Sequence, residues 1–278
     1  MNNGEEILTM NTPAENAVVC VVVIGIIVMG AYIIYKMKDE IEEQFTSYIK
    51  KDIYEPDIDI RYINLDRRKD RDEKIIIELN KSDIIKSLYK RVSAIDGKKV
   101  NLEQFSRFNS SYESLNKKRG WIGCAESHKQ LWRDCIKGNK NMLIFEDDAI
   151  LKDEYDENIE QSLKNLPNEF DIIYYNTVDY AIHEPYNKLY NKLTNKNFLL
   201  TNYLVSPSGA DKLLKYTEPY NPKKQIDSYI VEMTRENILN AYLFKLPTTY
   251  TIQDFNESDV QEKKNRQIKH NIHANIIK

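Results

Sequence analysis

Three consecutive carboxylates, Glu146, Asp147 and Asp148, follow an apolar run at residues 142–145. A short apolar run of this kind predicts a strand that is covered on both faces. Like charges at the end of such a strand repel one another unless a cation or a basic group lies among them. Side chains alternate along a strand, so Asp147 should point away from the other two. The triplet therefore predicts a divalent metal site, and the alternative is a solvated turn.

The segments that would position this triplet alternate between strand and helix patterns. The predicted strands span residues 58–65, 90–95, 141–146, 171–176, 198–206 and 241–246. The predicted helices span residues 68–80, 123–137 and 225–237, with one more before Pro167 and one opened by Ser206 and Pro207. This alternation predicts an α/β domain with a mainly parallel sheet, whose ligands lie beyond the carboxyl ends of the strands. Asp66, Asp96 and the acidic triplet all follow strands in that way.

Residues 17–35 form an uncharged segment dominated by Val and Ile. At about 1.5 Å per residue, a helix of this length spans the roughly 30 Å of a hydrocarbon core. The preceding residues contain no Lys or Arg and carry Glu5, Glu6 and Glu15, the opposite of the basic start of a signal peptide. We therefore predict one retained, single-pass transmembrane helix, which separates a tail at 1–16 from a stalk at 36–57 and a domain at 58–278.

The basic residues nearest this segment, Lys36, Lys38, Lys50 and Lys51, all follow it. Lys and Arg mark the cytosolic flank of a span, so the charge bias predicts a cytosolic domain without excluding the lumenal side. The net charge of −3, with interspersed signs, argues against nucleic acid as a main partner.

The three cysteines provide no disulfide framework. Cys20 lies in the predicted span, and Cys124 and Cys135 are too far apart on one predicted helix to bridge. This agrees with a reducing compartment without requiring one.

Seven stretches of the chain, in this order, resemble glycosyltransferase family 25, the lipooligosaccharide and procollagen galactosyltransferase group. They lie at residues 62–68 with 70–71, 94–98, 122–124 with 127–128, 143–148, 203–207 with 209–210, 227 and 258–260. The resemblance implies a GT-A type, Rossmann-like fold and a UDP-sugar donor, with galactose as the expected sugar. It also implies a divalent cation, with Mn²⁺ expected and Mg²⁺ as the alternative, and transfer with inversion to a hydroxyl of a glycan or protein acceptor.

The resemblance gives the acidic residues their roles. A metal clamped between carboxylates and phosphate oxygens can neutralise the diphosphate leaving group. Glu146 and Asp148, with Asp147 beside them, are the candidate ligands. Inverting transfer also needs a general base, and by resemblance Asp227 is that base. The alternative for Asp227 is a carboxylate that only stabilises the start of a helix.

Further polar residues are candidates for contacts with the donor. They are Asn64, Asp66, Arg67, Arg68, Arg71, Asp96, Gln253 and Asp259. The arginines open a helix after a strand, where basic side chains and free backbone amides can together hold phosphate, although an exposed basic face paired with acidic neighbours is the alternative. Asn64 and Asp96 end neighbouring strands and could bind uracil or ribose, but Asp96 with Gly97 could equally form a tight turn.

His128 and the two tryptophans have structural interpretations. We expect an interior hydrogen bond for His128 and core packing for Trp121 and Trp132. Trp121 and Glu126 depart from the usual family pattern, which leaves the donor or acceptor preference open. The leading hypothesis is a membrane-anchored, metal-dependent UDP-sugar hexosyltransferase. The alternative is a catalytically silent relative that serves as a carbohydrate-binding or assembly module.

Overall fold

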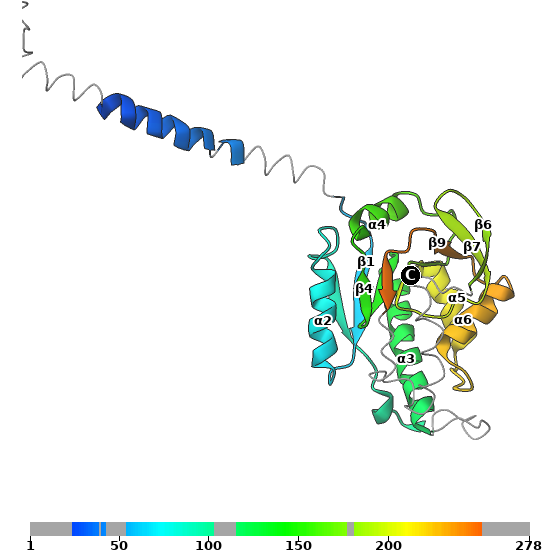
Figure 1. The fold of residues 1–278 in the computed structure, drawn as a ribbon. Helices are drawn as coiled ribbons and strands as arrows, with labels where there is room; N and C mark the ends of the chain where they lie inside the picture. Colours follow the sequence, from blue (N-terminus) through cyan, green and yellow to red (C-terminus); the bar gives the residue numbers. More distant parts are fainter. Residues whose placement is uncertain (1–23, 39, 43–53, 103–114, 177–180, 252–278) are drawn as a thin grey trace, which may run out of the picture. The chain divides into compact units, whose positions relative to one another are not determined.

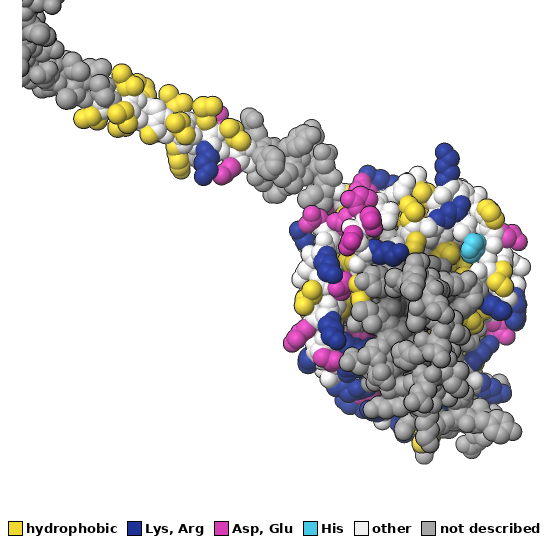
Figure 2. Space-filling model, viewed as in Figure 1, with side chains coloured by type: hydrophobic (Ala, Val, Ile, Leu, Met, Phe, Trp, Pro, Cys, Tyr) yellow, Lys and Arg dark blue, Asp and Glu magenta, His cyan; other side chains and the backbone are white. Residues whose placement is uncertain are grey.

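The computed structural model describes residues 24–38, 40–42, 54–102, 115–176 and 181–251. The chain divides into two compact units, residues 1–53 and residues 54–278. Residues 24–38 of the first unit are helical, and Figure 2 shows hydrophobic side chains along this helix, with Ile27 and Val28 64% and 63% exposed. Among the described residues, no helix combines the length and apolar character needed to cross a membrane. Residues 17–23 of the predicted anchor lie outside the described residues.

The second unit is built on an eight-stranded sheet flanked by helices (Figure 1). The strands of this sheet, in spatial order, are β2 (Tyr89–Ser93), β1 (Asp59–Asn64), β3 (Met142–Glu146), β8 (Asn202–Val205), β5 (Ile172–Tyr174), β9 (Ala241–Phe244), β7 (Tyr190–Asn195) and β6 (Ile182–Pro185). A two-stranded sheet pairs β4 (Ala149–Leu151) with β10 (Thr249–Thr251). The helices are α2 (Lys69–Leu79), α3 (Leu115–Gly138), α4 (Tyr155–Lys164), α5 (Pro207–Thr217) and α6 (Ile226–Arg235), with a 3₁₀ turn, η1, at Gly97–Lys99.

The two faces of the large sheet have separate cores. One core joins the sheet to α3, α5 and α6 and includes Trp132 and Ile230. The other joins the sheet to α2 and α4 and includes Ile75 and Ile159. Because the central strands are covered on both faces, they are continuous apolar runs, as a buried strand requires.

The prediction of an α/β domain is confirmed, whereas the prediction of a mainly parallel sheet is wrong. Among the described strands, β1–β2, β1–β3 and β5–β9 are parallel pairs. The pairs β3–β8, β5–β8, β7–β9 and β6–β7 are antiparallel. A buried strand has the same apolar pattern in either direction, so its sequence does not reveal that β8 runs opposite to β3 and β5 on both sides. The edge hairpin β6–β7 and the short strands β4 and β10 were also absent from the predicted elements.

Helix α3 begins at Leu115, well before the predicted start at residue 123. Gly120 and Gly123 weaken the helix pattern there, because glycine is unfavourable within helices. Gly123 has a packing reason: a Cβ at this position would lie 2.8 Å from the backbone nitrogen of Gly97. A Cβ on Gly97 would likewise lie 1.8 Å from the Arg119 carbonyl oxygen, so Gly97 and Gly123 together let α3 approach the loop that follows β2.

Gly209, in the first turns of α5, lies against the backbone of Asp171, and a Cβ there would lie 2.1 Å from the Asp171 carbonyl oxygen. We predict that Gly209→Ala lowers the free energy of unfolding by at least about 1 to 3 kcal/mol, the usual cost of overpacking. The matched control is Gly138→Ala at the end of α3, where nothing lies within 4 Å and a gain of up to about 1 kcal/mol is expected. Chemical denaturation measures both, and an unchanged midpoint for Gly209→Ala would contradict the close approach.

Candidate active site

The sheet brings the predicted site residues that follow its strands to one edge, the edge at the carboxyl ends of those strands. Strands β1, β2, β3, β5 and β9 run in the same direction, so their carboxyl ends lie together. The alternation along β3 places Ile144 in the core between the sheet and α3, and Phe145 in the core between the sheet and α2. The same alternation continues past the strand and separates the acidic triplet into two groups.

Asp147 faces α2, as predicted from the alternation. Its carboxylate accepts hydrogen bonds from Arg71 Nη1 at 2.8 Å and from Asn64 Nδ2 at 2.9 Å. Burial raises the pKa of Asp147, although Arg71 and Asn64 both oppose this. Asp147 is thus held by protein partners on the side of the sheet opposite α3.

Glu146 and Asp148 lie on the α3 side. Glu146 Oε1 lies 3.3 Å from His128 Nε2. Burial raises the pKa of Asp148 to about 7, and the charge of Glu146 adds to this effect. Asp148 Oδ1 is buried and has no hydrogen-bond partner among the described residues. Two neighbouring carboxylates with a buried, unpartnered oxygen fit the ligand set of a divalent cation.

Asp227 lies in the first turn of α6, where the charge of Glu146 acts on it. Glu146, Asp148 and Asp227 together are called the acidic centre. Burial raises the pKa of Asp227 to about 6, backbone hydrogen bonds from Ser228 and Leu199 oppose the rise, and the charge of Glu146 adds to it. Ser228 N donates to Asp227 Oδ1 at 2.7 Å. Leu199 has a φ of 93°, which non-glycine residues seldom adopt, and the loop at this residue directs a backbone N–H toward Asp227.

The predicted donor contacts near α2 are engaged in ion pairs. Arg67 Nε donates to Asp96 Oδ2 at 3.2 Å, and Arg68 Nη2 donates to Asp70 Oδ2 at 2.7 Å. Asp96 also accepts from Lys98 N and thereby opens the turn η1. Both alternatives raised by the sequence, paired arginines and a turn at Asp96, are therefore present in the structure.

Arg91 on β2 is a residue that the sequence patterns did not single out. It donates from Nη2 to Asn64 Oδ1 at 2.9 Å and to Asp66 Oδ1 at 2.8 Å. Asn64 is only 1% exposed. A charged residue within a predicted strand is the signal that could have identified Arg91. Gln253 and Asp259 lie outside the described residues.

Cys124 and His128 are further residues at the acidic centre. They stand four residues apart on α3, and one ligand atom from each, with one from Glu146, all lie within 4.8 Å of one another. His128 Nδ1 lies 2.8 Å from the Tyr203 hydroxyl, so the predicted interior hydrogen bond is confirmed. Trp121 and Trp132 are buried, as predicted. The i, i+4 spacing of Cys124 and His128 in the sequence was the available signal for a shared helix face.

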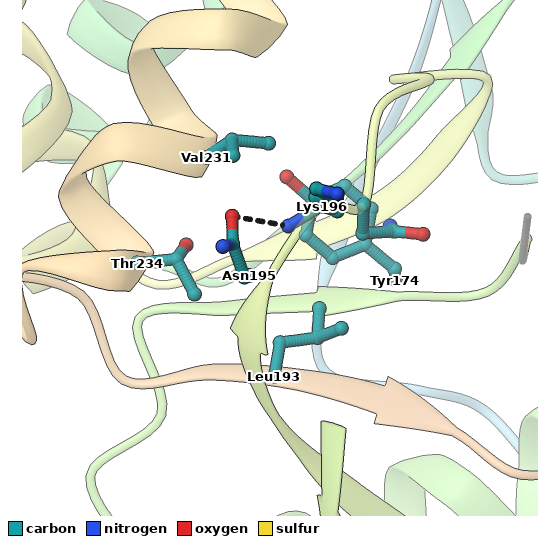
Figure 3. Close-up of a pocket in the computed structure, with 7 residues that line it drawn as sticks. Tyr174, Leu193, Asn195, Lys196, Val231 and Thr234 are labelled. Carbon is teal, nitrogen blue, oxygen red and sulfur yellow. Dashed lines mark hydrogen bonds between the residues drawn. The ribbon is translucent and has the colours of Figure 1, made fainter. Parts of the chain in front are cut away.

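A small cavity lies on the α6 side of the sheet and is shown in Figure 3. Tyr174, Leu193 and Thr234 are among its lining residues, and the backbone N–H of Lys196 donates to Asn195 Oδ1 at 2.9 Å. Even with the adjoining open solvent included, its empty space is only about 160 Å³, which is below the roughly 300 Å³ at which ligand pockets begin. This cavity is therefore too small to be the pocket for a nucleotide sugar.

The fold and the site define an α/β protein with an acidic centre at the carboxyl edge of its sheet. The model of glycosyltransferase family 25 (LPS biosynthesis protein) matches residues 58–230. The chain belongs to glycosyltransferase family 25.

Two curated relatives illustrate this similarity. Procollagen galactosyltransferase 2 of Homo sapiens is 26% identical over 200 residues, which cover 66% of this chain and 31% of the relative. Procollagen lysyl hydroxylase and glycosyltransferase of Acanthamoeba polyphaga mimivirus is 29% identical over 134 residues, which cover 40% of this chain and 14% of the relative. The chain thus spans about a third or less of the length of these relatives.

The orientation of the triplet predicts unequal effects on metal binding. Asp148→Asn should weaken Mn²⁺ binding at least tenfold, because a neutral amide is a poorer ligand for a hard cation than a carboxylate. Asp147→Asn is the matched control: its position faces Arg71, so Mn²⁺ affinity should stay within about threefold of the parent. Electron paramagnetic resonance of free Mn²⁺ measures both affinities. Equal losses in the two variants would show that the triplet acts as one site.

Proposed function

We propose that residues 58–278 form a GT-A type transferase that moves a hexose, galactose, from a UDP-sugar to a hydroxyl of a glycan or protein acceptor, with inversion at the sugar carbon. The observation that supports this most is the convergence of Glu146, Asp148 and Asp227 at one sheet edge in a member of family 25. The relatives named procollagen galactosyltransferase support galactose as the sugar.

Glu146 and Asp148 would hold the divalent cation, Mn²⁺ or Mg²⁺. The buried, unpartnered Oδ1 of Asp148 supports this assignment, since a buried oxygen without a partner is costly in a folded protein. The cation would supply positive charge that neutralises the diphosphate leaving group.

Asp227 would act as the general base. A pKa raised to about 6 leaves the carboxylate mainly ionised at neutral pH and close to the optimum for proton transfer. The backbone donors Ser228 and Leu199 hold the carboxylate in one orientation. As the acceptor oxygen attacks the sugar carbon, its proton passes to Asp227, and the electrons of the broken bond leave with the diphosphate.

The basic and polar residues near α2 would contact the remainder of the donor. Arg67 is the most accessible of the paired arginines, with 36% of its side chain exposed, and phosphate oxygens would compete with Asp96 for its guanidinium. Asn64 donates a hydrogen bond to Asp147 and accepts one from Arg91, so we propose that it acts by holding these two side chains in place. Asp66, Arg68, Arg71, Gln253 and Asp259 remain proposed donor contacts.

Removal of the base should slow transfer without weakening donor binding. For Asp227→Asn, we predict that kcat falls by about 10² to 10⁴ while the affinities for UDP and Mn²⁺ stay near those of the parent. Release of UDP from UDP-galactose in the presence of an acceptor measures the rate. Asp211→Asn is the matched control, because this exposed carboxylate on α5 pairs with Lys215 and should keep full activity.

Two results would change these assignments. If Asp227→Asn loses UDP affinity but keeps its turnover at saturating donor, Asp227 belongs to the donor site. If the parent releases no UDP from any of a panel of UDP-sugars, the domain is a silent carbohydrate-binding or assembly module.

We also propose that residues 17–35 anchor the protein in a membrane. The exposed apolar side chains of the described part, such as Ile27 and Val28, support this. The full chain should stay with membranes after alkaline extraction, and Ile27→Asp with Val28→Asp should release it. Ile77→Asp on α2 is the control, because Ile77 is also 63% exposed and should not alter the partition. Release of the parent chain would contradict the anchor.

A further inference from the structure

Three side chains of different chemistry meet beside the acidic centre. Cys124 and His128 come from α3, and Glu146 comes from the end of β3. A sulfur, an imidazole nitrogen and a carboxylate oxygen from these residues lie within 4.8 Å of one another. From this grouping we infer that Cys124, His128 and Glu146 form a site for a borderline-soft divalent cation, with Zn²⁺ as the best fit.

The spacing of the ligand atoms agrees with one small ion. Zn²⁺ binds sulfur at about 2.3 Å and nitrogen or oxygen at about 2.0 to 2.2 Å, which places tetrahedral ligand atoms roughly 3.3 to 3.6 Å apart. His128 Nε2 and Glu146 Oε1 are already 3.3 Å apart. Cys124 stands one helical turn before His128, on the same face of α3, and its sulfur, within 4.8 Å of the other two ligand atoms, would move closer to them when the cation binds.

The surroundings also suit a metal-bound imidazole. Ligating histidines commonly use the second ring nitrogen for a hydrogen bond that fixes the ring. Here His128 Nδ1 lies 2.8 Å from the Tyr203 hydroxyl, and Trp132 Nε1 donates to that same hydroxyl at 3.0 Å. His128 is 1% exposed and Tyr203 is fully buried. The imidazole is therefore held with Nε2 directed at Glu146.

A second observation indicates that this region receives a cation. The buried Oδ1 of Asp148, two residues after Glu146, has no partner among the described residues. Burial raises the pKa of the Cys124 thiol well above its usual range, and the charges of Glu146, Asp227 and Asp148 add to this rise, so without a cation the thiol stays protonated. When the cation binds, Cys124 would coordinate as a thiolate and its proton would pass to solvent.

Glu146 belongs to two ligand sets. With Asp148 it offers an all-oxygen set, which suits Mn²⁺, whereas with Cys124 and His128 it offers a softer set, which suits Zn²⁺. One carboxylate cannot fill both sets at full strength, so Zn²⁺ should compete with Mn²⁺. The softer set would then make the protein sensitive to inhibition by Zn²⁺.

Cobalt substitution tests this site without any sugar donor. Co²⁺ occupies zinc sites and gives thiolate charge-transfer absorption in the near ultraviolet. We predict this band in the full-length protein at one equivalent of Co²⁺, and its loss on addition of Zn²⁺. Cys124→Ser should abolish the band and weaken Zn²⁺ binding by more than about 100-fold, because loss of even an outer partner costs roughly 10- to 100-fold.

The other cysteines are matched controls. Cys135→Ser changes a buried thiol on the same helix, which donates to the Lys140 carbonyl oxygen, and it should keep the band. Cys20→Ser should also keep the band. Absence of the band in the parent protein, or its survival in Cys124→Ser, would overturn the proposal.

A pair of variants separates this site from the proposed Mn²⁺ site. Cys124→Ser should lose Co²⁺ charge transfer and keep Mn²⁺ binding measured by electron paramagnetic resonance. Asp148→Asn should weaken Mn²⁺ binding and keep the Co²⁺ band. If Asp148→Asn loses the band as strongly as Cys124→Ser does, the softer set is not a separate site and the proposal fails. Circular dichroism establishes that each variant is folded.

Discussion

The burial of negative charge at the end of β3 is the constraint on which the rest of the site depends. Helices cover β3 on both faces, so the three carboxylates that follow it are partly buried. The strand alternation then sends Glu146 and Asp148 toward α3 and Asp147 toward α2. A buried charge must be matched by donors or by opposite charge, because an unpaired one is very costly. Each side of the sheet therefore has to supply its own partners.

The α2 side supplies them from the protein itself. Arg71 and Asn64 hold Asp147, and Arg91 joins Asn64 to Asp66. Removing one partner of a buried ion pair typically costs about 3 to 5 kcal/mol. Arg71 therefore has a structural role whether or not it also meets phosphate.

The α3 side supplies fewer partners. His128 Nε2 lies 3.3 Å from Glu146 Oε1, and backbone N–H groups donate to Asp227. Asp148 Oδ1 has no hydrogen-bond partner among the described residues. The charge that is missing there is what a bound cation would provide. Burial raises the pKa of Asp148 to about 7 and that of Asp227 to about 6, and the charge of Glu146 adds to both rises. Structural stability and the capacity to bind a cation thus oppose each other at this position.

The sequence by itself determined the α/β class, the buried strand β3, the orientation of Asp147 and the family, because these depend on local alternation and on ordered motifs. Sequence could not decide the direction of β8, since a strand buried on both faces has the same apolar pattern whichever way it runs. Nor could it show that Arg91 holds Asn64, or that Cys124 and His128 face Glu146, because those contacts join segments far apart in the chain. Only the tertiary structure decided which carboxylates found partners on α2 and which were left facing α3.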